Sequence, residues 1–193
     1  MPFSKKTLTD LLQSLADRHE SNGTVPASSA TIAFWTRLLN KGVAYCADKL
    51  RLTKSTSLTT VSGVIALPDD FLVRDSVFKG DIELTQVDAN PANVGLCYWI
   101  TGNQTDGFVL NTTEDETYTV NYAFKPADLV NGTDKCIIPD PEAVVAYAYS
   151  KIRKAESDPF EDADEAMTEV DIRIKEMISQ FAVNTNSVSF TIE

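Results

Sequence analysis

Histidine and paired cysteines are nearly missing from this sequence, and their scarcity removes several kinds of active site. The 193 residues include one histidine, His19, and three widely separated cysteines, Cys46, Cys97 and Cys136. Zinc sites need several His or Cys ligands at short spacings, and no C-x-x-C pair is present. We therefore expect no metal and no disulfide framework, with the three thiols reduced and buried.

Long apolar runs and positive charge are also in short supply. No run approaches the ~18 apolar residues of a membrane span, and residues 1–6 lead directly into an amphipathic pattern without a secretory segment. Lys and Arg number 17 against 28 Asp and Glu, which gives a net charge of −11. An acidic surface repels a phosphate backbone, so we expect no specific nucleic-acid binding, and the lack of a long apolar run predicts no membrane partner.

Two parts of the chain carry apolar residues at helical spacing. In the first part, the pattern predicts helices over residues 4–20 and 28–51, with Ser4 as the expected N-cap of the first. In the second part, it predicts helices over residues 141–156 and 161–181, where Pro141 fits the first helical position. The segment between the two helical parts has a different residue pattern.

Residues 55–140 are rich in β-branched and aromatic residues and contain frequent turn signals, as is typical of an antiparallel sheet. The expected strands are Ser57–Leu67, Phe71–Lys79, Ile82–Val87, Leu96–Thr101, Phe108–Thr112 and Thr117–Phe124. In the last strand the even-numbered residues from Tyr118 to Phe124 are apolar or aromatic, which predicts one buried face. Residues 102–107 predict a hairpin loop.

These elements together predict an α+β fold. We expect a helical bundle of about four helices, with an antiparallel β insertion between helices two and three, and an extended C-terminal tail. A length of 193 residues suits one domain. We expect that domain to occupy residues 1–182 and the C-terminal extension to occupy residues 183–193.

The chain stops on an alternating run, NTNSVSFTIE. Val188, Phe190 and Ile192 share one side of it, and this period of two is that of a strand with one buried face. A polar leader, Asn184–Asn186, separates the run from the last helix. The pattern predicts a lone strand that must bury three apolar side chains.

Few residues are candidates for catalysis. A nucleophile activated by histidine would depend on His19, and no G-x-S-x-G motif accompanies it. The adjacent carboxylates Asp69 and Asp70 permit an acid–base interpretation, but the Pro68 that precedes them makes a turn the favoured interpretation. No G-x-G-x-x-G or Walker A motif is present, so we expect neither enzymatic activity nor a cofactor.

Several short stretches, taken in order, resemble one known family. They are Thr7–Leu12, Phe34–Gly42, Ile65–Phe71 with its LPDDF motif, Tyr98–Ile100, Phe108–Leu110, the spaced Tyr118 and Tyr122, Phe124–Pro126 and Ile137–Pro139. This order resembles the tailed-bacteriophage head-to-tail adaptor (connector) family.

The resemblance implies a structural virion protein at the head–tail junction, assembled in the host cytoplasm. Such adaptors form a ring, usually of twelve copies, between the portal protein and a downstream tail component, and they serve viral genome ejection. The family pattern places a C-terminal extension on the portal. It implies that Val188, Phe190 and Ile192 bind the portal while their backbone joins a portal edge strand. DNA passes through the ring lumen, and acidic residues that line the lumen would prevent the DNA from binding to it.

Other contacts are expected on apolar helical stripes and on one strand. Trp35, Leu39, Ile174 and Met177 are candidates for contacts between subunits, with a plain intramolecular core as the alternative. Tyr98 and Trp99 are neighbours in a strand, so one faces inward and the other outward. The outward ring is a candidate for contact with the tail.

Three alternatives stay open from the sequence. The β segment, with Tyr98, Trp99 and acidic loops, is compatible with a carbohydrate- or receptor-binding phage module. An enzyme acting through Asp69 and Asp70 is the second alternative. In the third, the C-terminal strand packs on the chain's own sheet.

Overall fold

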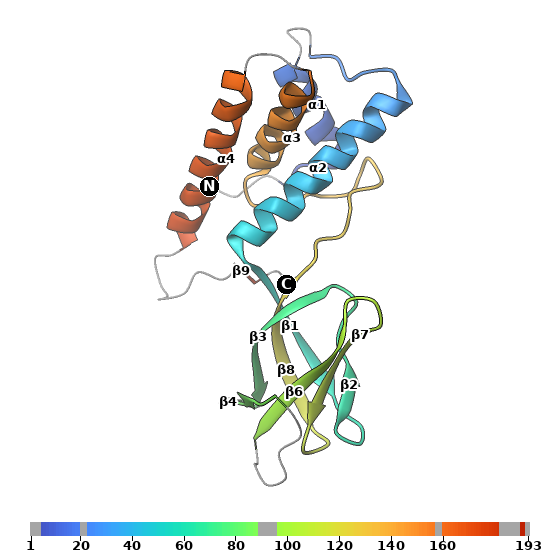
Figure 1. Ribbon diagram of the computed structural model, residues 1–193, viewed down its shortest axis with the longest axis vertical. Helices are drawn as coiled ribbons and strands as arrows, with labels where there is room; N and C mark the ends of the chain where they lie inside the picture. The colour runs from blue at the N-terminus through green and yellow to red at the C-terminus, as the bar shows by residue number, and fades with distance from the viewer. Residues whose placement is uncertain (1–4, 20–22, 89–95, 157–159, 182–189, 192–193) are drawn as a thin grey trace. The chain divides into compact units, whose positions relative to one another are not determined.

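The computed structural model describes residues 5–19, 23–88, 96–156, 160–181 and 190–191. It confirms the α+β fold, with four helices and with strands between helices two and three (Figure 1). The chain divides into two compact units, a helical unit of Met1–Leu50 with Pro126–Val188 and a β unit of Arg51–Lys125 with Ser189–Glu193. The grouping of residues 1–182 into one domain stays a prediction.

The helical unit is organised around a central helix. Its elements are α1 (Leu8–His19), α2 (Ser29–Leu50), α3 (Pro141–Ala155) and α4 (Phe160–Phe181). α3 packs against each of the other three helices and lies between α2 and α4 in Figure 1. Small and branched apolar residues of α3, Ala143 to Ala146 and Ala148, have no exposed surface. Their small size lets neighbouring helices approach closely.

Hydrogen-bonding caps fix where α1 and α3 begin. At α1, the Asp10 N–H donates to Thr7 Oγ1 over 3.2 Å, and the Thr7 N–H donates to Asp10 Oδ2 over 2.9 Å. This reciprocal cap places the start at Leu8, whereas the expected cap, Ser4, lies outside the described residues. At α3, Asp140 Oδ1 accepts from the Glu142 N–H over 3.1 Å, and Pro141 is the first helical residue, as the sequence predicts.

Gly42 lies where α2 packs tightly against α3. A Cβ at this position would lie 3.0 Å from the Val144 backbone oxygen and 3.2 Å from the Tyr147 ring. A side chain here would push the two helices apart, which explains a glycine in the interior of a helix where alanine has the higher propensity.

The β unit contains two sheets. Its strands are β1 (Leu52–Thr59), β2 (Val64–Ala66), β3 (Phe71–Lys79), β4 (Ile82–Glu83), β5 (Thr85–Gln86), β6 (Cys97–Asn103), β7 (Gly107–Thr112), β8 (Thr117–Phe124) and β9 (Phe190–Thr191). One sheet has the order β4-β3-β8-β1-β9 and the other β2-β7-β6-β5. Pairing is antiparallel except between β5 and β6 and between β1 and β9.

The core of the β unit comes from alternating side chains. Tyr118, Val120, Tyr122 and Phe124 of β8 are all buried, which confirms the predicted face. Aromatic contact joins the two sheets, because the Phe71 ring of β3 lies 5.2 Å from the Phe108 ring of β7, centroid to centroid.

Two expected strands are wrong in their bounds. The strand expected over Ser57–Leu67 is two strands, because a tight turn intervenes in which Ser62 and Gly63 have φ of 56° and 72°. The strand expected over Ile82–Val87 is likewise β4 and β5, which belong to different sheets. The hairpin loop expected over residues 102–107 does connect β6 to β7.

Candidate interaction surfaces

The carboxylate of Asp70 is engaged in structural contacts within the β unit. Its Oδ2 lies 2.6 Å from Lys54 Nζ, and its Oδ1 accepts a 3.0 Å hydrogen bond from the Tyr122 hydroxyl. Burial, then this hydrogen bond and the negative charge of Asp70, raises the pKa of Tyr122 to about 12. Asp69 is exposed in the same turn. The two carboxylates thus lie in the turn that the favoured interpretation predicts.

His19 and the three thiols also have structural surroundings. His19 Nε2 lies 2.8 Å from Glu156 Oε1, which joins the end of α1 to the end of α3. Cys46, Cys97 and Cys136 are free and buried, as predicted. Burial is the main cause that raises the pKa of Cys46 to about 12 and that of Cys136 to about 11. Both thiols therefore stay protonated and unreactive near neutral pH.

No metal-binding arrangement is found in the described ranges. Within them, no group of three His, Cys, Asp or Glu side chains is placed to hold a metal ion. Among the same residues, no helix combines the length and the apolar character that crossing a bilayer requires.

The C-terminal strand lies at a sheet edge of its own chain. Phe190 pairs with Leu52 and Thr191 with Thr53, in parallel register. This pairing matches the alternative in which the strand packs on its own sheet, and it comprises two residue pairs among the described residues. Val188 and Ile192, which are also expected to bind the portal, lie outside the described residues, as does the side chain of Phe190.

The four subunit-interface candidates lie in the core of the helical unit. Trp35 is 3% exposed, Leu39 0%, Ile174 6% and Met177 1%. Their burial follows from the same stripes that predicted them, and it agrees with the intramolecular alternative. Their exposure lends no support to a role between subunits, which stays a prediction.

The two tail-contact candidates face opposite ways in β6. Tyr98 is 1% exposed and Trp99 is partly exposed. Trp99 is therefore the outward ring of the pair. A carbohydrate platform built from both rings is not available, because Tyr98 belongs to the core of the β unit.

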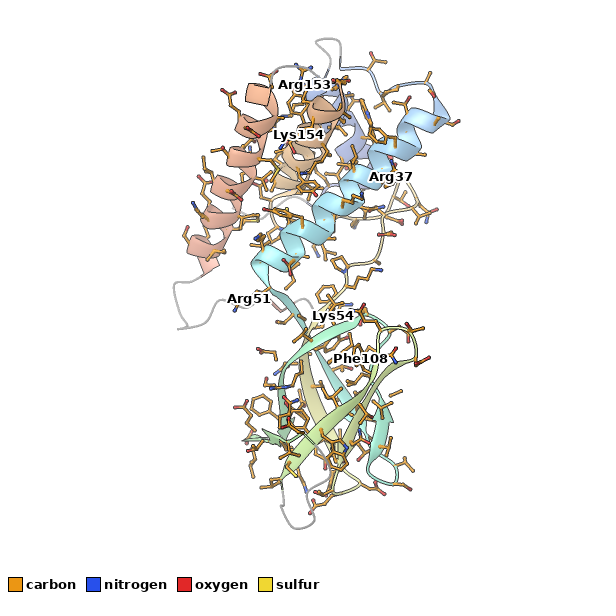
Figure 2. The ribbon with its side chains drawn as sticks, in the orientation of Figure 1. Arg37, Arg51, Lys54, Phe108, Arg153 and Lys154 are labelled. Carbon is orange, nitrogen blue, oxygen red and sulfur yellow. The ribbon has the colours of Figure 1, made fainter. Side chains whose placement is uncertain are left out.

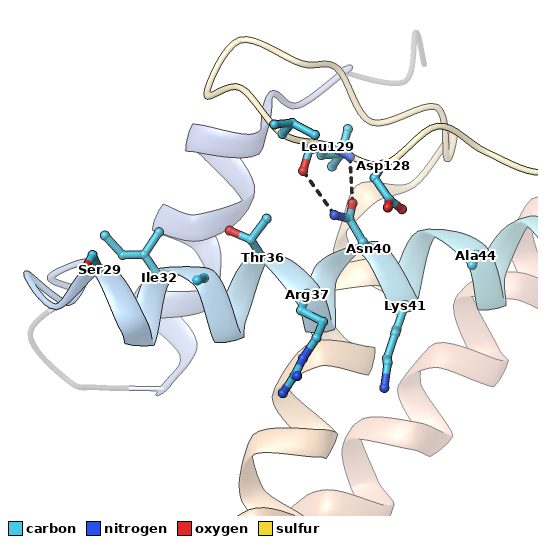
Figure 3. A pocket seen from close by; sticks show the side chains of 11 residues that line it. Ser29, Ile32, Thr36, Arg37, Asn40, Lys41, Ala44, Asp128 and Leu129 are labelled. Atoms are coloured by element: carbon cyan, nitrogen blue, oxygen red, sulfur yellow. Dashed lines mark hydrogen bonds between the residues drawn. The ribbon is translucent and has the colours of Figure 1, made fainter.

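A groove runs along the outward side of α2, and the sequence did not point to it. It has a volume of about 710 Å³, and its second wall is the loop at Asp128–Val130 (Figure 3). Asn40 fixes that wall, because its Nδ2 donates to the Leu129 carbonyl over 3.1 Å and its Oδ1 accepts from the Leu129 N–H over 2.8 Å. We call this hollow the α2 groove.

The α2 groove has an apolar floor and a positively charged rim. Its apolar lining consists of Ile32, Ala33, Ala44, Leu129 and Val130. Arg37 and Lys41, one turn apart and exposed, form the positive part of the rim (Figure 3; Arg37 is also labelled in Figure 2), and Asp128 is the one acidic residue that lines it. The basic residues at i and i+4 mark this side of α2 in the sequence, but they do not by themselves indicate a groove, because its second wall comes from residues 128–130.

The outward side of α4 has the opposite sign. Its exposed residues include Asp164, Glu165, Asp171, Ile172 and Glu176, which we call the acidic face. Ile172 is 50% exposed and lies off the buried stripe of the helix. An apolar residue outside the predicted stripe is the signal that could have found this face.

Comparison with known proteins agrees with the resemblance drawn from the sequence. A search of curated proteins finds no match. A family model described as SU10 adaptor protein matches residues 6–187, nearly the whole chain. The protein therefore belongs to the SU10 adaptor protein family, a family of phage head-to-tail adaptors.

Proposed function

We propose that this chain joins the phage portal ring to a downstream tail component as a ring-forming adaptor, and that its C-terminal strand docks on the portal. Family membership makes it a structural phage adaptor of the head–tail junction. The alternating run of Val188, Phe190 and Ile192, which the family pattern places on the portal, supports the finer part of the proposal. Among the described residues β9 pairs with β1 at a sheet edge, and a strand at an edge can exchange its own sheet for that of a partner.

The estimated free energy of docking one C-terminal strand on the portal predicts a weak contact per copy. Three apolar side chains contribute about 1.5–3 kcal/mol each when buried, and about six ladder hydrogen bonds add about 1 kcal/mol net each. Ordering about eight residues costs ~1–2 kcal/mol apiece. The sum is near zero for one tail, so many tails around a ring must act together. We therefore expect a monomer in isolation that assembles into a ring, of twelve copies in the family pattern, on the portal.

The charge of the chain suits the passage of DNA. A net charge of −11 per copy, repeated around a ring, would repel the phosphates of DNA in the lumen and prevent it from sticking. No base-specific contact is needed for that role.

Deletion of residues 184–193 tests the docking strand. The full-length and shortened chains are mixed with candidate portal rings and viewed by electron microscopy. We expect added density with the symmetry of the portal from the full-length chain only, and the same urea unfolding midpoint for both chains.

Either of two results would overturn the proposal. A large loss of stability in the shortened chain would assign the strand to its own sheet. A stable ring in sizing chromatography without any portal would contradict assembly on the partner.

A further inference from the structure

The α2 groove and the acidic face belong to helices on either side of α3. α3 packs against both α2 and α4 and lies between them in Figure 1, and each of the two surfaces is on the outward side of its helix. Two different surfaces on one subunit can join copies head to tail, and a head-to-tail contact closes into a ring when its rotation permits. The ring proposed above needs a contact of this kind.

The two surfaces each have an apolar centre. The α2 groove offers an apolar hollow of about 710 Å³ beside Ala44. The acidic face presents one large apolar side chain, Ile172, at 50% exposure, with Glu165 seven residues before it and Glu176 four residues after it, on the same side of the helix. An apolar anchor with a polar rim is the usual composition of a binding hot spot.

Their charges are also complementary. Arg37 and Lys41 form no ion pair among the described residues, and neither do Glu165 and Glu176. On the acidic face, Asp164 pairs with Lys154 of α3 at 3.4 Å.

Two further residues oppose this sign, Lys175 on α4 and Asp128 on the groove. Lys175 and Asp128 are of opposite charge to each other, so a contact between the two surfaces can pair them as well. Complementary potentials of this kind select the partner and the register of an interface.

We propose that the acidic face of one subunit docks in the α2 groove of the next, with Ile172 on the apolar floor and Glu165 and Glu176 against Arg37 and Lys41. This inference rests on the proposed ring, and it names the surfaces through which neighbouring copies meet. The occupant of the groove is thus a second copy of this chain.

Disulfide trapping tests the contact even when it is weak. One chain carries Ala44→Cys in the groove, and a second, differently sized by a tag, carries Ile172→Cys. Both positions are exposed, and the native cysteines are buried, so copper phenanthroline oxidation reports the new thiols. The control pairs Ala44→Cys with Gln104→Cys in the exposed hairpin loop. We expect at least about tenfold more mixed dimer from the first pair, since a specific contact raises the local concentration of its two thiols.

Charge reversal then separates a specific contact from random collision. Arg37→Glu with Lys41→Glu on the groove chain should lower the yield about tenfold, because like charges then face each other. Glu165→Lys with Glu176→Lys on the partner chain should restore it. Equal yields from the Ile172→Cys and Gln104→Cys pairs, or no restoration by the second reversal, would overturn the inference.

The same variants distinguish this inference from the proposed function. If the groove reversals leave portal-dependent rings intact under the electron microscope, the contact is wrong and the adaptor role stands. If the unaltered chain adds no density to any portal ring, the proposed function fails, while a specific mixed dimer would still support the contact between copies.

Discussion

Asp70 connects three strands of the β unit through one carboxylate. It follows Leu67-Pro68-Asp69 directly before β3. Its carboxylate forms an ion pair with Lys54 of β1 and accepts a hydrogen bond from the hydroxyl of Tyr122 of β8. Its backbone oxygen also accepts a 2.7 Å hydrogen bond from the Lys125 N–H. The LPDDF motif is therefore explained by folding, and the neighbouring Asp69 provides a matched comparison.

We expect Asp70→Asn to lower the free energy of unfolding by roughly 1–2 kcal/mol, because the partly exposed ion pair with Lys54 is lost and the Tyr122 hydroxyl then donates to a neutral acceptor in place of a charged one. Asp69→Asn changes the same chemistry on an exposed side chain without those partners, so it should stay within about 0.5 kcal/mol. Urea unfolding of the two variants measures the difference. Equal losses would show that Asp70 has no special structural role.

The sequence pattern correctly predicted which side chains are buried where burial alone determines the position of a residue. The alternation of Tyr118 and Tyr122 gave the correct buried face of β8, since period two has one meaning in a strand. It did not predict that α2 passes into β1 through Arg51 alone, which has φ of 51°. A residue other than glycine in the left-handed backbone conformation cannot be recognised from the sequence. The predicted start of β1 was therefore several residues too late.

The amide of Asn40 connects α2 to the loop that follows the β segment. Both of its hydrogen bonds go to the backbone of Leu129 (Figure 3). Leu129 is itself 5% exposed, so the two bonds position a buried anchor and, with it, the second wall of the α2 groove. This helix and loop are far apart in the sequence, which is why no local pattern predicted the groove.

We expect Asn40→Ala to lower the free energy of unfolding by about 1–2 kcal/mol, because the Leu129 N–H and carbonyl lose their partner in a partly buried place. Thr36→Ala removes a side chain from the same groove one turn earlier and should cost less than about 1 kcal/mol. Chemical denaturation gives both values. Asn40→Ala should also reduce disulfide trapping between Ala44→Cys and Ile172→Cys, whereas equal trapping would show that the wall is not needed for docking.

The functional surfaces of the whole molecule were harder to predict than its elements. Trp35 and Met177 lie on apolar helical stripes, and the structure uses both of them in the core. Arg37 and Ile172 have no distinctive sequence signal, because a solvated charge and a single exposed apolar residue are ordinary in a sequence. They gain meaning only when tertiary structure places a groove beside one and an acidic surface around the other.

The net charge of the whole chain leads to a last prediction about DNA. Acidic residues outnumber basic ones by 28 to 17, so association with duplex DNA would bring like charges together and release few counterions. We expect no change in the fluorescence anisotropy of a labelled duplex with the isolated chain or with portal-bound rings. The result should be the same between about 50 and 200 mM salt, a range over which phosphate-contacting proteins lose much of their affinity.

The charge-reversed chain supplies the matched control for this measurement. Glu165→Lys with Glu176→Lys makes each copy less negative while leaving the rest of the surface unchanged. If it begins to bind DNA at low salt, repulsion by carboxylates is what keeps the parent chain free. Salt-dependent binding by the parent chain itself would instead show that a basic surface outweighs the net negative charge. The proposal of a lumen that repels DNA would then be wrong.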